Sequence, residues 1–184
     1  MKEAEILKEG KVLIYPTDTI WGIGCDALNV EAIKKVKQIK GRDESKSFIL
    51  LMKDVEMLSH YVESVPLPAM ELMQKFDDKN IPITILYPNS KNLPLQNLSF
   101  NEYIGIRVPK NDFLQKLFWE FNRPIVSSSA NFSGQPSPQN FSQIDKQFLK
   151  SADYVSLFQR EDSSIKNPSL IFMLTSEGEI KQLR

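Results

Sequence analysis

Lys11-Val-Leu-Ile-Tyr15-Pro16-Thr-Asp-Thr19-Ile-Trp21-Gly-Ile-Gly24-Cys25-Asp26 is the segment from which the type of fold can first be inferred. Its opening apolar run, from Lys11 to Tyr15, predicts a strand, and Pro16 ends that strand. Two threonines, an aspartate and two glycines follow, a composition that predicts a tight polar loop. Hydroxyl groups and glycine amides in such a loop can hold a small zwitterion or an anion. A simple Asx or Ser/Thr turn between a strand and a helix explains the same residues.

Strand and helix patterns alternate along the rest of the chain. Apolar periodicity and capping residues predict helices at 3–9, 30–40, from 54 onward, 66–76, 112–121 and 144–150, and strands at 47–52, 81–87, 103–108, 124–126 and 154–157. Residues 170–184 predict a hairpin that turns at Ser176-Glu-Gly178. A hairpin is incompatible with a purely parallel sheet, so we expect an α/β (α+β) fold. In this fold helices flank a mixed sheet in a single domain, residues 1–184.

The composition narrows the classes of function. The 23 Lys+Arg and 23 Asp+Glu residues give a formal net charge of zero, which argues against a strongly basic coat for nucleic acid. No apolar run approaches the roughly 20 residues that span a bilayer, and the N-terminus carries no apolar signal core. A lone cysteine suits a reducing compartment, so we expect a cytoplasmic protein without membrane contact.

The histidine and cysteine inventory excludes several kinds of catalysis. His60 and Cys25 are the single residues of their types, so the chain cannot assemble a clustered His/Cys zinc site. A Ser-His-Asp or Cys-His arrangement would have to use His60, which lies in an ordinary amphipathic stretch and is expected at the surface. An enzyme built from this chain is therefore expected to work by positioning and electrostatics.

Three cations surround the end of the helix expected at 30–40. Lys40 ends this helix, and Arg42 and Lys46 follow on a loop that precedes a buried strand. Arginine offers a planar fork and lysine a point charge, so together they can grip a triphosphate. A lysine that complements a helix C-terminus, followed by a solvated charged turn, is the structural alternative.

Pro124-Ile-Val-Ser-Ser-Ser129-Ala-Asn131-Phe-Ser-Gly134 places small polar side chains directly after a short buried strand. Hydroxyl groups, an amide and free backbone N–H groups are the groups that read the sugar and phosphates of a nucleotide. A polar loop that caps the next helix is the alternative. Because one cap needs fewer polar side chains than this segment offers, we favour a ligand site in the segment.

Arg107 lies inside the apolar strand segment Gly105-Ile-Arg107-Val-Pro109. A buried guanidinium is energetically expensive unless it is paired or reaches a ligand. A structural salt bridge and a substrate contact both satisfy this requirement, and the sequence leaves both open.

These segments, in this order, resemble the YrdC/Sua family of threonylcarbamoyl-AMP synthases. The family's motifs correspond to Pro16-Thr-Asp-Thr19 with Trp21-Gly-Ile-Gly24, to Lys40-Gly-Arg42 with Lys46, to Gly105-Ile-Arg-Val-Pro109, and to Ser129-Ala-Asn131 with Ser133-Gly134. The resemblance covers the chain from about residue 11 to residue 184. Each motif is loose by itself, but their order and spacing are specific.

The resemblance implies the YrdC/RibB-like fold, a twisted mixed sheet with a concave basic groove. It also implies a reaction that joins L-threonine, bicarbonate or CO2, and ATP into threonylcarbamoyl-AMP and pyrophosphate. Downstream proteins would then transfer the threonylcarbamoyl group to a tRNA adenosine beside the anticodon. ATP would be a substrate that brings Mg²⁺ with it, and the resemblance implies no metal site in the protein.

The same resemblance implies the site residues. ATP would bind to Lys40, Arg42, Lys46, Ser129, Asn131 and Arg184, with Lys40 and Arg42 catalytic, and threonine to Tyr15, Thr17, Thr19, Thr84 and Arg107. The chemistry agrees with the residue inventory, because the carbamate formed from threonine attacks the α-phosphate of ATP without a protein nucleophile. The protein has to align the reactants and neutralise charge on the departing pyrophosphate.

The chain departs from the family pattern at several positions. Ser47 stands where proline is usual, Trp21 replaces a common tyrosine, Leu170 stands where threonine is common, and Asn80-Ile-Pro-Ile-Thr84 replaces Pro-Gly-Pro-Leu-Thr. The additional C-terminal domain of longer Sua-type members is not expected here.

Two alternatives to synthase activity stay open. One is a paralogue without synthase activity whose groove binds RNA, which the zero net charge weakens. The other is a carbamoyl-adenylate domain of a hydrogenase-maturation system.

Overall fold

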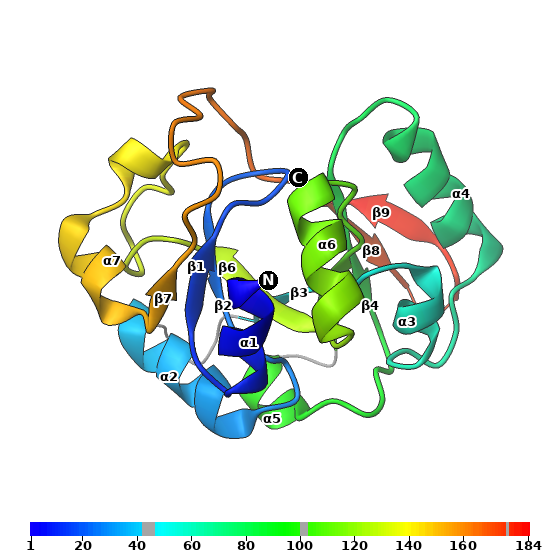
Figure 1. The fold of residues 1–184 in the computed structure, drawn as a ribbon. Helices are drawn as coiled ribbons and strands as arrows, with labels where there is room; N and C mark the ends of the chain where they lie inside the picture. The colour runs from blue at the N-terminus through cyan, green and yellow to red at the C-terminus, as the bar shows by residue number, and fades with distance from the viewer. Residues whose placement is uncertain (42–46, 100–102, 176) are drawn as a thin grey trace.

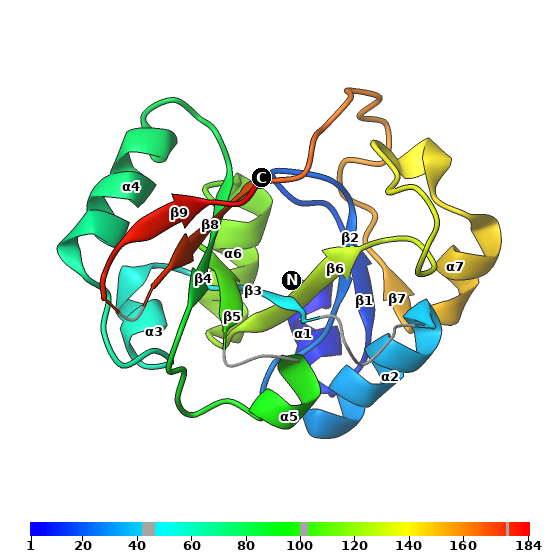
Figure 2. The same cartoon turned by 180° about the vertical axis from the view of Figure 1, so that it is seen from behind.

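The computed structural model describes residues 1–41, 47–99, 103–175 and 177–184 (Figure 1). In these residues the strands form one sheet in the order β7-β1-β2-β6-β3-β5-β4-β8-β9, and Figure 2 shows its strong twist from behind. The strands are β1 (Leu13–Tyr15), β2 (Gly22–Gly24), β3 (Ile49–Leu51), β4 (Ile83–Tyr87), β5 (Ile104–Arg107), β6 (Ile125–Ser129), β7 (Tyr154–Val155), β8 (Leu170–Leu174) and β9 (Ile180–Gln182).

The sheet is mixed, which confirms the expected fold class. Parallel pairs join β1 to β7, β3 to β5 and β4 to β8, whereas the other neighbouring strands are antiparallel. The predicted C-terminal hairpin is present as the antiparallel pair β8 and β9, with Gly178 at a left-handed φ of 84° in its turn. Ser176, the first residue of the predicted turn, lies outside the described residues.

Helices flank the sheet, and most of them lie at the positions expected from their periodicity and caps. They are α1 (Lys2–Lys8), α2 (Val30–Lys40), α3 (Val55–Ser59), α4 (Leu67–Asp77), α5 (Leu95–Leu98), α6 (Asp112–Phe121), α7 (Lys146–Ser151) and a short 3-10 helix at Phe141–Gln143. The side chains of Asn29, Asp54 and Asn111 each accept a hydrogen bond from the helix that follows, as an N-cap does. The sequence did not predict α5 or the 3-10 helix, each of which is at most one turn long.

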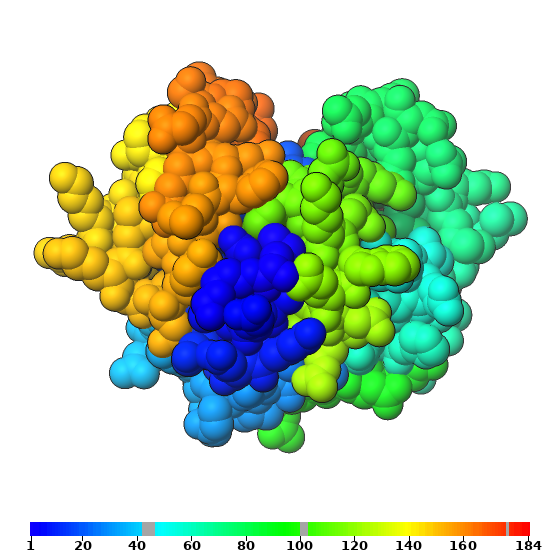
Figure 3. Space-filling view, in the orientation of Figure 1, coloured from blue at the N-terminus to red at the C-terminus, as the bar shows by residue number. Residues whose placement is uncertain are grey.

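The two faces of the sheet are covered differently. On one face, Leu13 and Leu51 pack against α1 and α6, which lie side by side in Figure 3. On the other face, Ile14, Leu50 and Val126 belong to a larger core that includes residues of α2, α4 and α7. Successive side chains of a strand point to opposite faces of the sheet. Strand residues that point the same way as Leu13 and Leu51 therefore lie on the face of α1 and α6, including the part of that face that these helices leave uncovered. None of the helices in the described ranges has both the length and the apolar composition needed to cross a membrane.

The glycine-rich end of the opening segment is a strand, and the prediction of a loop there was wrong. Gly22–Gly24 forms β2, antiparallel to both β1 and β6. A Cβ atom on Gly24 would lie 1.8 Å from the carbonyl oxygen of Val126. Glycine has a low strand propensity, but here it permits the close approach of two backbones.

Cys25 follows β2 and is fully buried in the larger core. Burial raises the pKa of the Cys25 thiol, and the negative charge of Asp26 adds to this shift. The thiolate is the reactive form, so we expect iodoacetamide at pH 8 to modify Cys25 at least about 100-fold more slowly in the native chain than in guanidinium chloride. Mass spectrometry of timed samples, with glutathione as an internal control, measures both rates. Equal rates would contradict the buried position.

Candidate functional site

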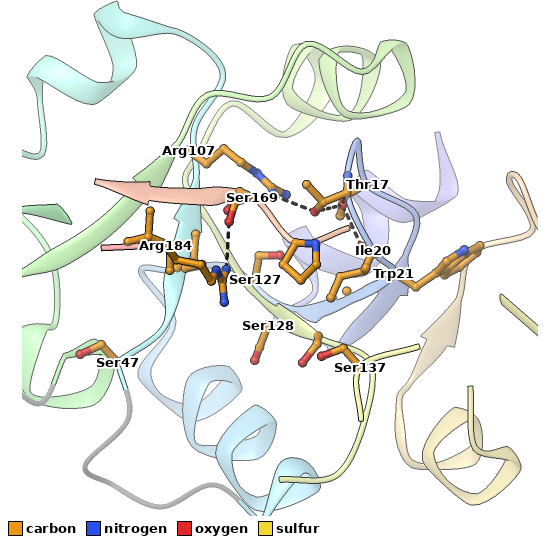
Figure 4. Close-up of a pocket in the computed structure, with 16 residues that line it drawn as sticks. Thr17, Ile20, Trp21, Ser47, Arg107, Ser127, Ser128, Ser137, Ser169 and Arg184 are labelled. Carbon is orange, nitrogen blue, oxygen red and sulfur yellow. Dashed lines mark hydrogen bonds between the residues drawn. The ribbon is translucent and has the colours of Figure 1, made fainter. Parts of the chain in front are cut away.

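A cavity of about 270 Å³ lies against the uncovered part of the sheet face that α1 and α6 cover elsewhere (Figure 4). Three strand residues of the lining point to that face, as the register of the strands and the alternation of side chains require: Ile49 of β3, Arg107 of β5 and Ser127 of β6. The residues that line the cavity are Thr17, Thr19, Ile20, Trp21, Gly22, Ser47, Ile49, Arg107, Ser127, Ser128, Ser129, Ser137, Pro168, Ser169, Ile171 and Arg184. Segments from the beginning, the middle and the end of the chain therefore meet in one polar cavity.

The threonines after β1 form one edge of this cavity and are almost fully buried. The hydroxyl groups of Thr17 and Thr19 lie 2.9 Å apart, and the Thr17 hydroxyl also donates to the carbonyl oxygen of Ile20 at 2.8 Å. The backbone N–H of Thr19 donates to the Thr17 hydroxyl at 3.0 Å. The loop is thus a Ser/Thr turn and a cavity wall at the same time, so the two interpretations of its sequence are compatible.

Arg107 brings a buried positive charge to the same edge. Its side chain is only 6% exposed, and one terminal nitrogen donates to the Thr19 hydroxyl at 2.7 Å. The other terminal nitrogen lies 3.2 Å from Oδ1 of Asp18 in an ion pair. Figure 4 shows the side chain reaching from β5 toward Thr17. A structural salt bridge and a position on the cavity wall therefore occur together at this arginine.

Lys40 lies behind the cavity wall, where it holds the segment that follows β6. Its ammonium group donates to the carbonyl oxygens of Ser129 at 2.6 Å and Asn131 at 2.7 Å. The backbone N–H of Ser133 in turn donates to the carbonyl oxygen of Lys40 at 2.8 Å. Lys40 is only 2% exposed and does not line the cavity, whereas Ser129 does.

Asn131 is directed into its own turn. Its side-chain nitrogen donates to the carbonyl oxygens of Phe132 and Gln135 at 2.9 and 2.8 Å, and its Oδ1 has no hydrogen-bond partner among the described residues. Asn131 does not line the cavity. In the structure as described, it shapes the turn that follows Ser129.

Residues next to the last two strands, Ser169 before β8 and Arg184 after β9, complete the cavity. Arg184 donates to the carbonyl oxygen of Ser169 at 3.0 Å, and both residues line the cavity. The hydroxyl groups of Ser169 and Thr84 lie 2.7 Å apart, but Thr84 is fully buried and does not line the cavity.

Tyr15 lies outside the cavity wall, although it belongs to the opening segment. It is fully buried in the cluster formed with α1 and α6, and its hydroxyl donates to the carbonyl oxygen of Val126 at 3.3 Å. Burial raises the pKa of the Tyr15 hydroxyl, so the side chain is neutral at physiological pH.

Several residues that line the cavity had no predicted role, and two predicted phosphate ligands do not belong to the described part of the chain. Arg42 and Lys46 lie outside the described residues, and Ser47, which follows them in sequence, lines the cavity. Ser137, Pro168 and Ser169 also line the cavity, although no sequence pattern assigned a role to them. Ser137 and Pro168 lie in loops without periodicity. The departure from the family pattern at Leu170 was the only sequence signal next to Pro168 and Ser169. In the described part of the chain, no group of three or more His, Cys, Asp or Glu side chains could hold a metal ion.

A twisted mixed sheet with a cavity rich in hydroxyl groups and arginines on one face defines the class: an α/β protein whose sheet carries a site suited to a small polar or anionic ligand. The family model Sua5/YciO/YrdC, described as telomere recombination, matches residues 5–184. The chain belongs to this family, as its ordered motifs predicted.

Individual relatives agree with this assignment. Threonylcarbamoyl-AMP synthase of Pseudoalteromonas translucida (strain TAC 125) is 32% identical over 148 residues, covering 80% of this chain and 79% of the relative. The enzyme of the same name from Vibrio vulnificus (strain YJ016) is 33% identical over 141 residues, covering 77% of this chain and 76% of the relative.

Solved structures show the same fold. Sua5 from P. abyssi, crystallised with L-threonine, has a TM-score of 0.84 at 25% identity and covers 100% of this chain. The match includes 52% of the P. abyssi protein, so the chain spans about half of its length. E. coli YciO has a TM-score of 0.82 at 25% identity, with 100% of this chain and 86% of YciO covered.

Proposed function

We propose that this chain is an L-threonylcarbamoyladenylate synthase, which forms threonylcarbamoyl-AMP and pyrophosphate from L-threonine, bicarbonate or CO2, and ATP. The observation that carries the proposal is the cavity in which Arg107 and Thr19 face a strand of serines. Relatives named threonylcarbamoyl-AMP synthase that match most of the chain support the choice of reaction.

The edge of the cavity formed by Thr17, Thr19 and Arg107 suits the amino-acid substrate. A guanidinium binds a carboxylate with parallel hydrogen bonds, and the threonine hydroxyls offer donors and acceptors for the polar groups beside it. Ser169, held by the Thr84 hydroxyl at 2.7 Å, adds a hydroxyl from the far side. Tyr15 would support this region only from behind, since it does not line the cavity.

The serine side of the cavity suits the nucleotide. Figure 4 shows Ser128 and Ser137 across the cavity from Arg107 and Thr17. Ser129 and Arg184 would contact the sugar or phosphates, whereas Lys40 and Asn131 would shape the segment that carries Ser129. Arg42 and Lys46 would complete the phosphate site. Mg²⁺ would arrive with ATP, held mainly by its phosphates and water.

The proposed chemistry requires alignment more than reactive side chains. The threonine amine adds to CO2 and loses a proton, and an oxygen of the resulting carbamate attacks the α-phosphorus of ATP. A bond between this oxygen and phosphorus forms as the bond to pyrophosphate breaks. The protein would hold the two reactants in line and stabilise the negative charge that develops on the leaving group.

The proposal extends to the setting of the reaction. We infer one YrdC-like domain over residues 1–184 and action in the cytoplasm. Downstream proteins would transfer the threonylcarbamoyl group to tRNA. A paralogue without synthase activity would be recognised by direct binding of tRNA. Such binding would show an affinity that falls steeply as the salt concentration rises.

Incubation of the purified chain with ATP, Mg²⁺, L-threonine and bicarbonate is expected to release pyrophosphate and to yield a product with the mass of threonylcarbamoyl-AMP. Coupled detection of pyrophosphate and mass spectrometry measure the two products. Omission of threonine or bicarbonate provides the control. A protein that binds tRNA with a steep salt dependence but releases no threonine-dependent pyrophosphate would contradict the proposed function.

A further inference from the structure

The Arg107 guanidinium lies between two cavities. A second cavity of about 680 Å³, between α3, α4 and the end of β5, includes Asp18, Asp77, Lys110 and Arg107 among its lining residues. Arg107 lines both cavities, whereas Asp18 lines only the second and Thr19 only the first. The two terminal nitrogens of the guanidinium are therefore each contacted by one of two neighbouring residues of the same loop, Nη1 by Thr19 and Nη2 by Asp18.

The two contacts of Arg107 differ in kind. The contact with Thr19 is a directed hydrogen bond of 2.7 Å. The contact with Asp18 is an ion pair of 3.2 Å in which Oδ1 accepts no well-aligned hydrogen bond from any described residue. The Nε atom of Arg107 is buried and has no hydrogen-bond partner in the described ranges. Arginine has five N–H donors in a fixed plane, so a small rotation of this plane decides which donors face the first cavity.

We propose that Asp18 is a positioning residue for substrate recognition: the charge of its carboxylate, 3.2 Å from one terminal nitrogen, holds the Arg107 guanidinium in place beside the Thr19 hydroxyl, and the N–H donors so placed bind the carboxylate of the amino-acid substrate. This inference rests on the proposed function, since the ligand of Arg107 is taken to be L-threonine. Asp18 does not line the first cavity and so acts on the ligand through Arg107. Recognition by a planar fork tolerates deviations of only about 10–20°, so loss of the counter-charge is expected to weaken binding.

The alternative role of Asp18 is that of a structural counter-charge for a buried arginine. In that case its removal lowers the stability of the fold and leaves the affinity for threonine unchanged, because Thr19 still holds Arg107. The two roles are separated by a binding measurement combined with a double-mutant cycle, because residues that act through one another give non-additive effects.

Isothermal titration calorimetry with L-threonine on the complete chain tests the proposal. We expect Asp18→Ala to raise the Kd for threonine about 10-fold or more, Asp18→Glu to recover part of the loss, and the affinity for ATP to stay unchanged. Arg107→Ala is expected to weaken threonine binding further, and addition of Asp18→Ala to it is expected to cost nothing more. Glu56→Ala is the matched control, because Glu56 also lines the second cavity and its carboxylate forms no ion pair with Arg107 in the structure.

Two outcomes overturn the inference while the proposed function stands. One is a normal threonine affinity in a folded Asp18→Ala variant, and the other is an additive cycle with Arg107→Ala. If Asp18→Ala does not fold, Asp18→Asn, which removes the charge and keeps the size, is measured in its place under the same criteria. A wild-type chain that binds no threonine is a different failure, which overturns the proposed function as well.

Discussion

Replacement of Lys40 with methionine is expected to lower kcat/KM for ATP by about 100-fold or more, as measured by threonine-dependent pyrophosphate release with ATP varied. The Lys40 ammonium holds the carbonyl oxygens of Ser129 and Asn131 within 2.6 and 2.7 Å. Methionine fills a similar volume but can donate to neither carbonyl. The segment that carries Ser129 would lose these two hydrogen bonds to α2 and keep the backbone bond from Ser133 to the Lys40 carbonyl oxygen. The nucleotide side of the cavity would also lose a nearby positive charge.

Lys34→Met is the matched control for this change. Lys34 lies on the same helix, but its side chain is 58% exposed and forms only a surface ion pair with Glu31. Pairs of this kind contribute little to stability, so this variant is expected to keep wild-type kinetics. Thermal unfolding of both variants separates a loss of fold from a loss of activity. Wild-type kinetics in a folded Lys40→Met variant would show that Lys40 has no part in the reaction.

Gly24→Ala is expected to destabilise the fold by about 3 kcal/mol or more. A Cβ atom at this position would lie 1.8 Å from the carbonyl oxygen of Val126 and 3.0 Å from its carbonyl carbon. Both atoms belong to the backbone of β6, so the clash cannot be relieved by rotation of a side chain. For a chain of this size, the expected loss corresponds to a decrease in the unfolding temperature of about 6 °C or more, measured by circular dichroism.

Gly105→Ala provides the comparison within the same sheet. A Cβ atom there would meet side-chain atoms of Leu86, Ile49 and Thr84 at 3.2 to 3.4 Å, and side chains can adjust. We expect a loss of less than about 1 kcal/mol, partly offset by the lower chain entropy of the unfolded alanine variant. Similar unfolding temperatures for the two variants would contradict the close approach of β2 and β6.

Local sequence signals were sufficient for most helices and for the mixed character of the sheet. Asn29, Asp54 and Asn111 were identifiable as caps because a cap depends on a few neighbouring residues. The same local view failed at β2, whose glycines have low strand propensity, because the partner that requires them lies in β6, about a hundred residues away.

The site was only partly predictable for a related reason. Family motifs singled out Thr19 and Arg107, but the hydrogen bond that joins them depends on strand order and twist, which periodicity does not specify. The position of Lys40 behind the cavity wall likewise depends on how the end of α2 packs against the end of β6 and the residues after it. Ser137 and Pro168 carried no signal, because loop residues contribute to a cavity through the path of the chain rather than through a pattern.

The cavity is assembled from both ends of the chain, since Thr17 follows β1 and Arg184 follows β9. During synthesis, the N-terminal loop leaves the ribosome long before the residues that complete its ligand site. A nascent chain therefore has no complete cavity until residue 184 has left the exit tunnel. The contacts that complete the cavity join residues far apart in the sequence. A ligand that binds this cavity can therefore stabilise the fold only after all of these segments are in place.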